Sequence, residues 1–176
     1  MFLKTTSLLS FLCILAITLA AAGATQSVSG RVLDSGDTPI NGVSIQAYRD
    51  QRAVGAPVIS KSGNYKIEFP DGKPLDSVRY DHSDWYPAVV QDISGQNSHT
   101  IHKTLYRRGE KLSFIAVHQV ICDFERLAEI DKRNDQLKQN AERFRYKEAI
   151  AEIEKLPLPP DLQARIKEIK QKYGIY

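Results

Sequence analysis

Hydrophobic and polar residues alternate in short runs through the first hundred positions, and glycine, proline, aspartate or serine separates one run from the next. Such alternation places successive side chains on opposite faces of a strand. The pattern predicts about seven strands, at residues 28–33, 43–47, 58–60, 65–69, 78–80, 88–93 and 100–105. Evenly punctuated short strands are typical of an antiparallel β-sandwich, whose two sheets each bury one face.

The hydrophobic spacing changes to a helical period beyond residue 111. One apolar stripe is predicted to face a core and contains Ile115, Val117, Val120, Ile121, Phe124 and Leu127. A second helical run spans residues 141–156 and ends at Pro157. We expect a last helix with Asp161 as its cap and Gly174 at its C-terminal end. The predicted class is therefore α+β, with a sandwich over residues 25–108 and an α-helical extension over 109–176.

Residues 1–24 have the three parts of a secretory signal peptide. Lys4 precedes an apolar run from Leu8 to about Ala22, and residues 22–24 read Ala-Gly-Ala, a small-residue cleavage site. The alternative is an uncleaved anchor, but the run is shorter than the roughly 20 apolar residues that span a bilayer. We expect a secreted or periplasmic protein with no transmembrane segment after cleavage.

Composition and charge exclude several classes of protein. Hydrophobic residues make up 42% of the chain and charged residues 26%, which is ordinary for a globular domain. The chain after residue 24 has 23 basic and 21 acidic side chains, so no nucleic-acid partner is expected. It keeps one cysteine, Cys122, which is either buried or pairs between chains. The sequence leaves the oligomeric state open.

Three segments resemble the carboxypeptidase regulatory-like domains, which form a transthyretin-like (prealbumin-like) β-sandwich. They read SGRVLDSGDTPINGVSIQAY, SKSGNYKIEFP and SVRYDHSDWYPAVVQDI, and the resemblance covers about residues 26–106. Turn chemistry supports it, because Pro39 presets φ while Gly42 and Gly63 suit a strand entry and a turn. The resemblance implies a fold, and nothing in the chain resembles the peptidase itself.

The stretch FRYKEAIAEIEKLPLPPD, residues 144–161, is similar to the second helix and exit of a tetratricopeptide repeat. It spans less than one repeat, and about three are needed to bury their faces. The favoured interpretation is a helical hairpin that packs either on the sandwich or on a partner.

Aromatic residues near a bend are the candidate binding site. Trp85 and Tyr86, with Tyr80 nearby, are expected to be exposed, and sugar rings stack on flat aromatic faces while Asp81 and Asp84 accept hydroxyl hydrogens. The resembled fold is also similar to starch-binding-like sandwiches. The alternative is that these rings close the edge of the core.

Catalytic and metal chemistry have weaker signals. His118 and Cys122 lie four residues apart, which brings an imidazole and a thiol to one helix face, but no glycine-rich oxyanion turn precedes the cysteine. Asp81, His82 and Asp84 could be metal ligands, although a solvated loop is the simpler interpretation. We therefore assign no catalytic residue, no metal and no cofactor.

A small transthyretin-like hydrolase is the alternative function. Residues 106–109, Tyr-Arg-Arg-Gly, are similar to the C-terminal tail of the 5-hydroxyisourate hydrolase, but Arg31 stands where that enzyme has a histidine. The sequence therefore predicts an exported, non-enzymatic binding or structural protein of the bacterial envelope. The expected partner is an envelope protein or a carbohydrate polymer.

Overall fold

The computed structural model of the chain describes residues 26–69, 73–91, 93, 98–133 and 140–175. The predicted signal peptide lies outside these residues. The eight strands are β1 (Gln26–Leu33), β2 (Ser44–Arg49), β3 (Arg52–Ile59), β4 (Asn64–Phe69), β5 (Ser77–Asp81), β6 (Ala88–Gln91), β7 (Ser98–Thr100) and β8 (Lys103–Thr104). The helices are α2 (Phe114–Arg133), α3 (Asn140–Ile153) and α4 (Pro160–Tyr173). The predicted α+β class is confirmed.

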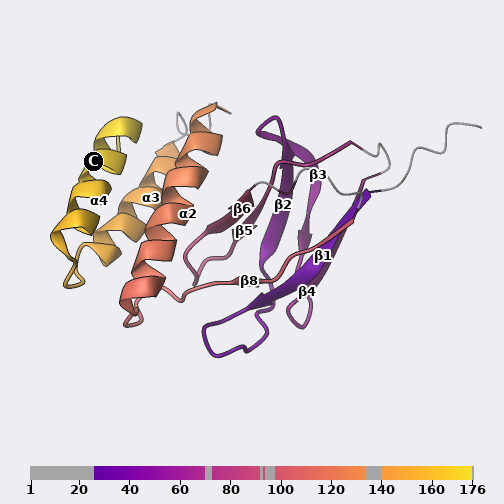
Figure 1. Ribbon diagram of the computed structural model, residues 1–176, viewed down its shortest axis with the longest axis horizontal. Coiled ribbons are helices and arrows are strands. Elements are labelled where there is room, and N and C mark those ends of the chain that lie inside the picture. Colours follow the sequence, from indigo (N-terminus) through magenta and orange to yellow (C-terminus); the bar gives the residue numbers. More distant parts are fainter. Residues whose placement is uncertain (1–25, 70–72, 92, 94–97, 134–139, 176) are drawn as a thin grey trace, which may run out of the picture.

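The strands form two facing sheets (Figure 1). In the first, β1 pairs with β4 on one side and with β7 and β8 on the other; the second has the order β3-β2-β5-β6 and is antiparallel throughout. Strand alternation turns Val28, Val32, Ile45, Val78 and Tyr80 into the space between the sheets, where all five are fully buried. Their burial makes this space the core of the sandwich.

The structure differs from the prediction in the strands beside β1. The single strand expected at 100–105 is two short strands, and both run parallel to β1. Between β7 and β8 the backbone of Ile101 lies very close to Gly30 of β1. A Cβ at position 30 would be 1.8 Å from the carbonyl oxygen of Ile101. Beside it, the Arg31 amide donates to Nδ1 of His102 at 3.2 Å. The described residues therefore contain eight strands, of which β7 and β8 are not antiparallel to their neighbour.

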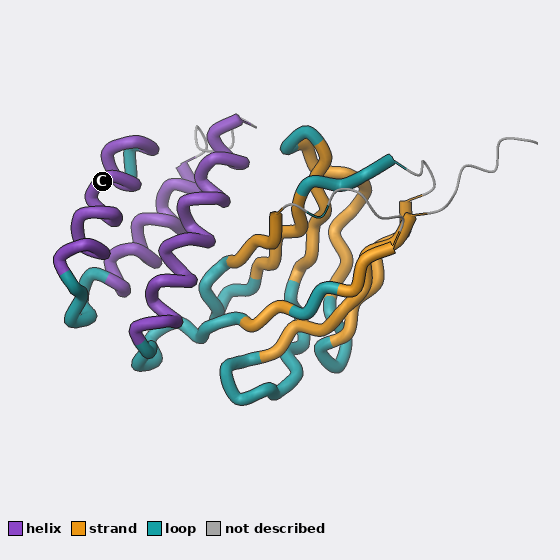
Figure 2. Tube along the Cα trace, viewed as in Figure 1, coloured by secondary structure: helices purple, strands orange, loops and turns teal. Residues whose placement is uncertain are grey.

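The three helices form a further layer on the outer face of the second sheet (Figures 1 and 2). Tyr48, Tyr86 and Val89 from the sheet side share one buried cluster with Val120 and Phe124 of α2. In β5 the residues on both faces are buried, because the core covers one face and α2 covers the other. The helical extension therefore packs on its own sandwich, which the sequence had left open.

The two ends of α4 were predicted with different success: the predicted N-terminal cap was wrong and the predicted C-terminal cap was right. Pro159 is the N-terminal cap residue and Pro160 begins the helix, so Asp161 lies in the first turn and is not the cap. Gly174 has the left-handed conformation that ends many helices, and its amide donates to the Lys170 carbonyl. The predicted glycine cap is confirmed.

Candidate functional site

Two of the three aromatic rings expected to be exposed are buried. Tyr80 is 0% and Tyr86 is 3% exposed. Tyr80 meets Tyr65 edge-on, with their hydroxyl oxygens 2.7 Å apart, and Tyr86 meets Phe124 edge-on beneath the helices. Burial raises the pKa of Tyr86 to about 12. The expected exposure was wrong for both rings, so neither offers a face on which a sugar could stack.

The other predicted binding residues lie in different surroundings. Asp81 pairs with the guanidinium of Arg79, and Trp85 is half-buried against the sandwich core. Asp84 is exposed and accepts a hydrogen bond from the Ser83 hydroxyl at 3.1 Å. Asp84 also borders a shallow hollow of about 340 Å³. That hollow is lined by Ser83, Asp84, Arg107, Arg108, Gly109 and Glu152. The structure therefore does not bring the five predicted residues together into one open site.

The side chains considered as metal ligands already have partners. Nδ1 of His82 accepts the Asp84 amide at 3.1 Å, Asp81 pairs with Arg79, and Asp84 accepts from the Ser83 hydroxyl. Within the described ranges, no three histidine, cysteine, aspartate or glutamate side chains gather as a metal site would require.

Buried ion pairs join the helices to the sandwich. Arg79 of β5 donates to Asp131 of α2 at 2.7 Å, and both side chains are almost completely buried. The Tyr146 hydroxyl of α3 donates to the other Asp131 oxygen at 2.5 Å. Lys103 of β8 donates to Asp123 of α2 at 2.8 Å. The Arg79 and Lys103 contacts link strands to α2, and the Tyr146 contact links α3 to the same Asp131 of α2.

A third ion pair lies nearer the surface. Arg108, just after β8, makes two hydrogen bonds to the carboxylate of Glu152 on α3, at 2.7 and 3.2 Å. These bonds lower the pKa of Glu152, whereas desolvation raises the pKa of the more deeply buried Asp123. Sheet and helices are therefore held together by charge as well as by apolar contact.

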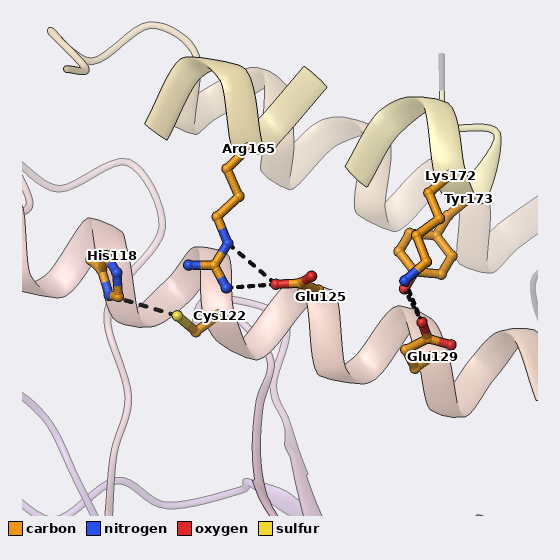
Figure 3. Close-up of polar contacts among 7 residues, drawn as sticks. All are labelled: His118, Cys122, Glu125, Glu129, Arg165, Lys172 and Tyr173. Atoms are coloured by element: carbon orange, nitrogen blue, oxygen red, sulfur yellow. Dashed lines mark hydrogen bonds and ion pairs between the residues drawn. The ribbon is translucent and has the colours of Figure 1, made fainter. Parts of the chain in front are cut away.

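Further contacts hold α4 on α2 (Figure 3). Arg165 donates to Glu125 at 2.6 Å, and Lys172 and Tyr173 both donate to Glu129 at 2.6 Å. These contacts join α4 to α2, and the Tyr146–Asp131 hydrogen bond joins α3 to α2. The helices are therefore fixed relative to one another by side-chain contacts.

His118 and Cys122 lie on the α2 surface that faces α4 (Figure 3). Nδ1 of His118 is 3.6 Å from Sγ of Cys122, so the expected proximity is confirmed. His118 is exposed and Cys122 is half-buried. Neither side chain lines the hollow beside Asp84, nor the hollows beside Phe114 and Leu156 that are described below. A nucleophilic thiol also needs a site that holds the substrate carbonyl. Proximity of the two side chains does not by itself provide one.

The first turn of α2 exposes two large hydrophobic side chains. Phe114 is 56% and Ile115 is 77% exposed; within the described residues, only Ile59 is a comparably exposed large hydrophobic side chain. Ile115 was predicted to belong to the buried stripe, and that was wrong. It precedes Val117 by two residues, which puts them about 200° apart around a helix. The helical period, applied residue by residue, identifies Ile115 as outward-facing.

A hollow of about 200 Å³ lies beside Phe114, between the start of α2 and the segment that joins α3 to α4. It is lined by Lys111, Leu112, Phe114, Val117, Leu156, Pro157, Leu158 and Pro159. Leu156 and Leu158 also border a second hollow of about 360 Å³. We call the eight residues that line the 200 Å³ hollow, together with Ile115, the helix-end surface.

Comparisons with known proteins give no family. No protein-family model matches the chain, and no curated protein matches it significantly. Among solved structures it is similar to a type II cohesin–X-dockerin complex of Acetivibrio cellulolyticus, with 14% identity over 55% of this chain and 72% of that one and a TM-score of 0.37. It is also similar to a 3-chlorocatechol 1,2-dioxygenase of Rhodococcus opacus, with 10% identity over 48% and 61% of the two chains and a TM-score of 0.36.

A third similar structure is a streptococcal ancillary pilin, with 13% identity over 48% of this chain and 33% of that one and a TM-score of 0.33. Scores and identities this low assign neither a family nor a function, and the three proteins differ in function among themselves.

Within the described part of the chain, none of the helices combines the length and the apolar character that a membrane crossing requires. The described residues form a β-sandwich with three helices packed on it.

Proposed function

We propose that this chain is an exported, non-enzymatic protein of the bacterial envelope that binds another protein through the helix-end surface. The exposure of Phe114, which lines an apolar hollow, and of its neighbour Ile115 in the first turn of α2 carries the proposal. Contiguous apolar side chains on a surface mark sites of protein contact, because leaving them in water is unfavourable. Burial of these two side chains by a partner would remove that cost.

The position of the surface supports this role. Its residues come from the start of α2, from Lys111 and Leu112 just before it, and from the segment between α3 and α4. Ion pairs join α2 and α3 to the sandwich. A surface that is ordered before binding loses less conformational entropy when a partner docks. The sandwich acts in this proposal as the rigid support for the helices.

We further propose that the sandwich belongs to the carboxypeptidase regulatory-like class. The segments that resemble this class occupy the strands and turns that the resemblance implies, and Gly42 and Gly63 have φ values of 76° and 73°. Glycine adopts that region with less strain than residues that carry a Cβ. This assignment concerns the fold, and the binding role does not depend on it.

A protein partner is favoured over a carbohydrate. Sugar recognition would use exposed aromatic faces, and Tyr80 and Tyr86 are buried while Trp85 is half-buried. Phe114 and Ile115 are instead an aromatic and a branched aliphatic side chain next to each other, which suits the core of a protein interface.

The proposal is tested with a double variant, Phe114→Ser with Ile115→Ser, in the cells that make the protein. After chemical crosslinking of intact cells, the tagged protein is purified and its crosslinked partners are identified by mass spectrometry. We expect a partner that is abundant with the wild type and at least about tenfold reduced with the double variant.

Ile59→Ser is the matched control, because Ile59 is 53% exposed but lies on β3, away from the helices. The control variant should retain the partner. Equal recovery of every crosslinked protein by the double variant and the wild type would refute the proposed function.

A further inference from the structure

Two exposed lysines accompany the helix-end surface. Lys111 lines the hollow, and Lys155 directly precedes Leu156; both are exposed. Within the part of the chain that the structure describes, no ion pair joins either lysine to a carboxylate. Lys155 also interacts electrostatically with the Glu152 carboxylate, so Lys111 is the ammonium group most available to a binding partner.

Two acidic residues next to these lysines in the sequence already have basic partners. Glu154 accepts two hydrogen bonds from Lys170, at 2.9 and 3.2 Å, and Glu110 pairs with Arg107 at 3.5 Å. In addition, α2 has no acidic residue in its first turn, so the partial positive charge of its N-terminus is not offset there by its own side chains. One carboxylate, that of the exposed Asp161 in the first turn of α4, stands against the two lysines, so a small positive excess is left at this surface.

The hollow itself suits an apolar side chain. Seven of its eight lining residues are leucine, proline, phenylalanine or valine. A cavity of about 150 Å³ between apolar side chains is large enough to hold a benzene ring, and this hollow is about 200 Å³. One large aliphatic or aromatic side chain of a partner therefore fits.

We infer that the partner presents an acidic, amphipathic peptide segment, whose apolar side chain enters this hollow and whose carboxylates meet Lys111 and Lys155. The inference rests on the proposed function and specifies the chemistry of its partner. A second copy of this chain fits less well, since a symmetric contact would bring the same surface, with the same lysines, face to face. Like charges opposed across an interface are unfavourable.

The test is an unbiased selection of short random peptides displayed on phage. The purified protein is the target, and the Phe114→Ser, Ile115→Ser double variant removes peptides that bind elsewhere. We expect the retained peptides to combine an aliphatic or aromatic residue with neighbouring aspartate or glutamate. Retained peptides that are basic or show no charge bias, or a selection that retains none, would overturn the inference.

One retained peptide is then measured by fluorescence anisotropy against Lys111→Glu, with Lys167→Glu as the matched control. Lys167 is an exposed lysine on α4 that does not line the hollow. We expect Lys111→Glu to weaken binding about three- to tenfold at low salt and less at high salt, and Lys167→Glu to leave it unchanged. Equal effects of the two substitutions would contradict the assigned role of Lys111.

The two proposals fail in different ways. If the double variant loses its partner in cells but the selected peptides are not acidic, the binding function stands and the partner chemistry is wrong. If sedimentation shows that the protein dimerises and that Ile115→Ser abolishes the dimer, the occupant is a second copy and the inference is overturned.

Discussion

At the scale of single residues, the structure depends on charges that the fold has removed from water. The guanidinium of Arg79 has Asp81 on its own strand and Asp131 on α2 as partners, and Asp131 also accepts from Tyr146. A buried charge is costly unless its partners remain in place. These residues therefore hold α2 and α3 against β5. Loss of any one of them would leave a buried polar or charged group without a partner.

We predict that Asp131→Ala lowers the free energy of unfolding by about 3 kcal/mol or more, because it leaves Arg79 buried with one fewer carboxylate partner. Urea denaturation measures the change. Lys66→Ala is the control, since the Lys66–Glu68 pair is about 60% exposed on both sides, and it should have no measurable effect. Similar losses for the two variants would mean that the buried pair does not hold the helices.

The Arg108–Glu152 pair gives a pH dependence. The hydrogen bonds from Arg108 lower the pKa of Glu152 in the folded chain. The pair therefore stabilises the fold fully at pH values above the ordinary glutamate pKa of about 4. This stabilisation is lost as the pH falls through the lowered pKa that Glu152 has in the folded chain. We predict that Glu152→Gln lowers the free energy of unfolding at neutral pH by about 1 kcal/mol. The difference from wild type should shrink in acid, and an equal difference at both pH values would contradict this account.

At the scale of elements, β1 organises the first sheet because three strands pair with it. Its central residue Gly30 has the Ile101 backbone against its open side, and the Tyr65 hydroxyl donates to the same Ile101 carbonyl at 2.9 Å. A side chain at this position would push the chain away between β7 and β8. The absence of a Cβ is therefore a requirement of this sheet.

Gly30→Ala should lower the free energy of unfolding by more than about 3 kcal/mol, since a Cβ would lie 1.8 Å from a backbone oxygen. Gly36→Ala is the matched control, because the nearest atom to its Cβ would be 3.4 Å away, and it should cost less than about 1 kcal/mol. Thermal unfolding followed by circular dichroism measures both. A mild effect of Gly30→Ala would show that β7 and β8 can move aside.

The elements were more predictable than the site. Alternation and turn residues predict most of the strands because both are local signals, and the helical period predicts the start of α2 within two residues. The strand expected at 58–60 was too short, because β3 already begins at Arg52. The pairing of Arg79 with Asp131 spans 52 residues and that of Lys103 with Asp123 spans 20, and no local pattern contains either. For the same reason the aromatic residues after β5 gave no sign that helices would cover Tyr86.

At the scale of the whole molecule, the three layers depend on one another. Removal of residues 111–176 would expose Tyr48, Tyr86 and Val89 and would take away the carboxylates that pair with Arg79 and Lys103. A truncated sandwich is therefore a poor reagent for locating function. Single substitutions at the helix-end surface are the better choice, because exposed positions seldom affect stability.

We predict that helices and sandwich unfold in one transition. Trp85, the single tryptophan, reports on the sandwich through its fluorescence, and far-ultraviolet circular dichroism reports mainly on the helices. The two signals should have the same midpoint in a urea titration. Loss of the helical signal at a lower urea concentration would show that the helical layer is a separate unit.

The central claim is that the helix-end surface binds another protein, and site-specific photo-crosslinking tests it most directly. A photoreactive amino acid replaces Ile115 in one strain and Ile59 in another, and both are irradiated in living cells. The account predicts a discrete crosslinked protein from position 115 that is absent from position 59. No crosslink from position 115, or the same products from both positions, would contradict it.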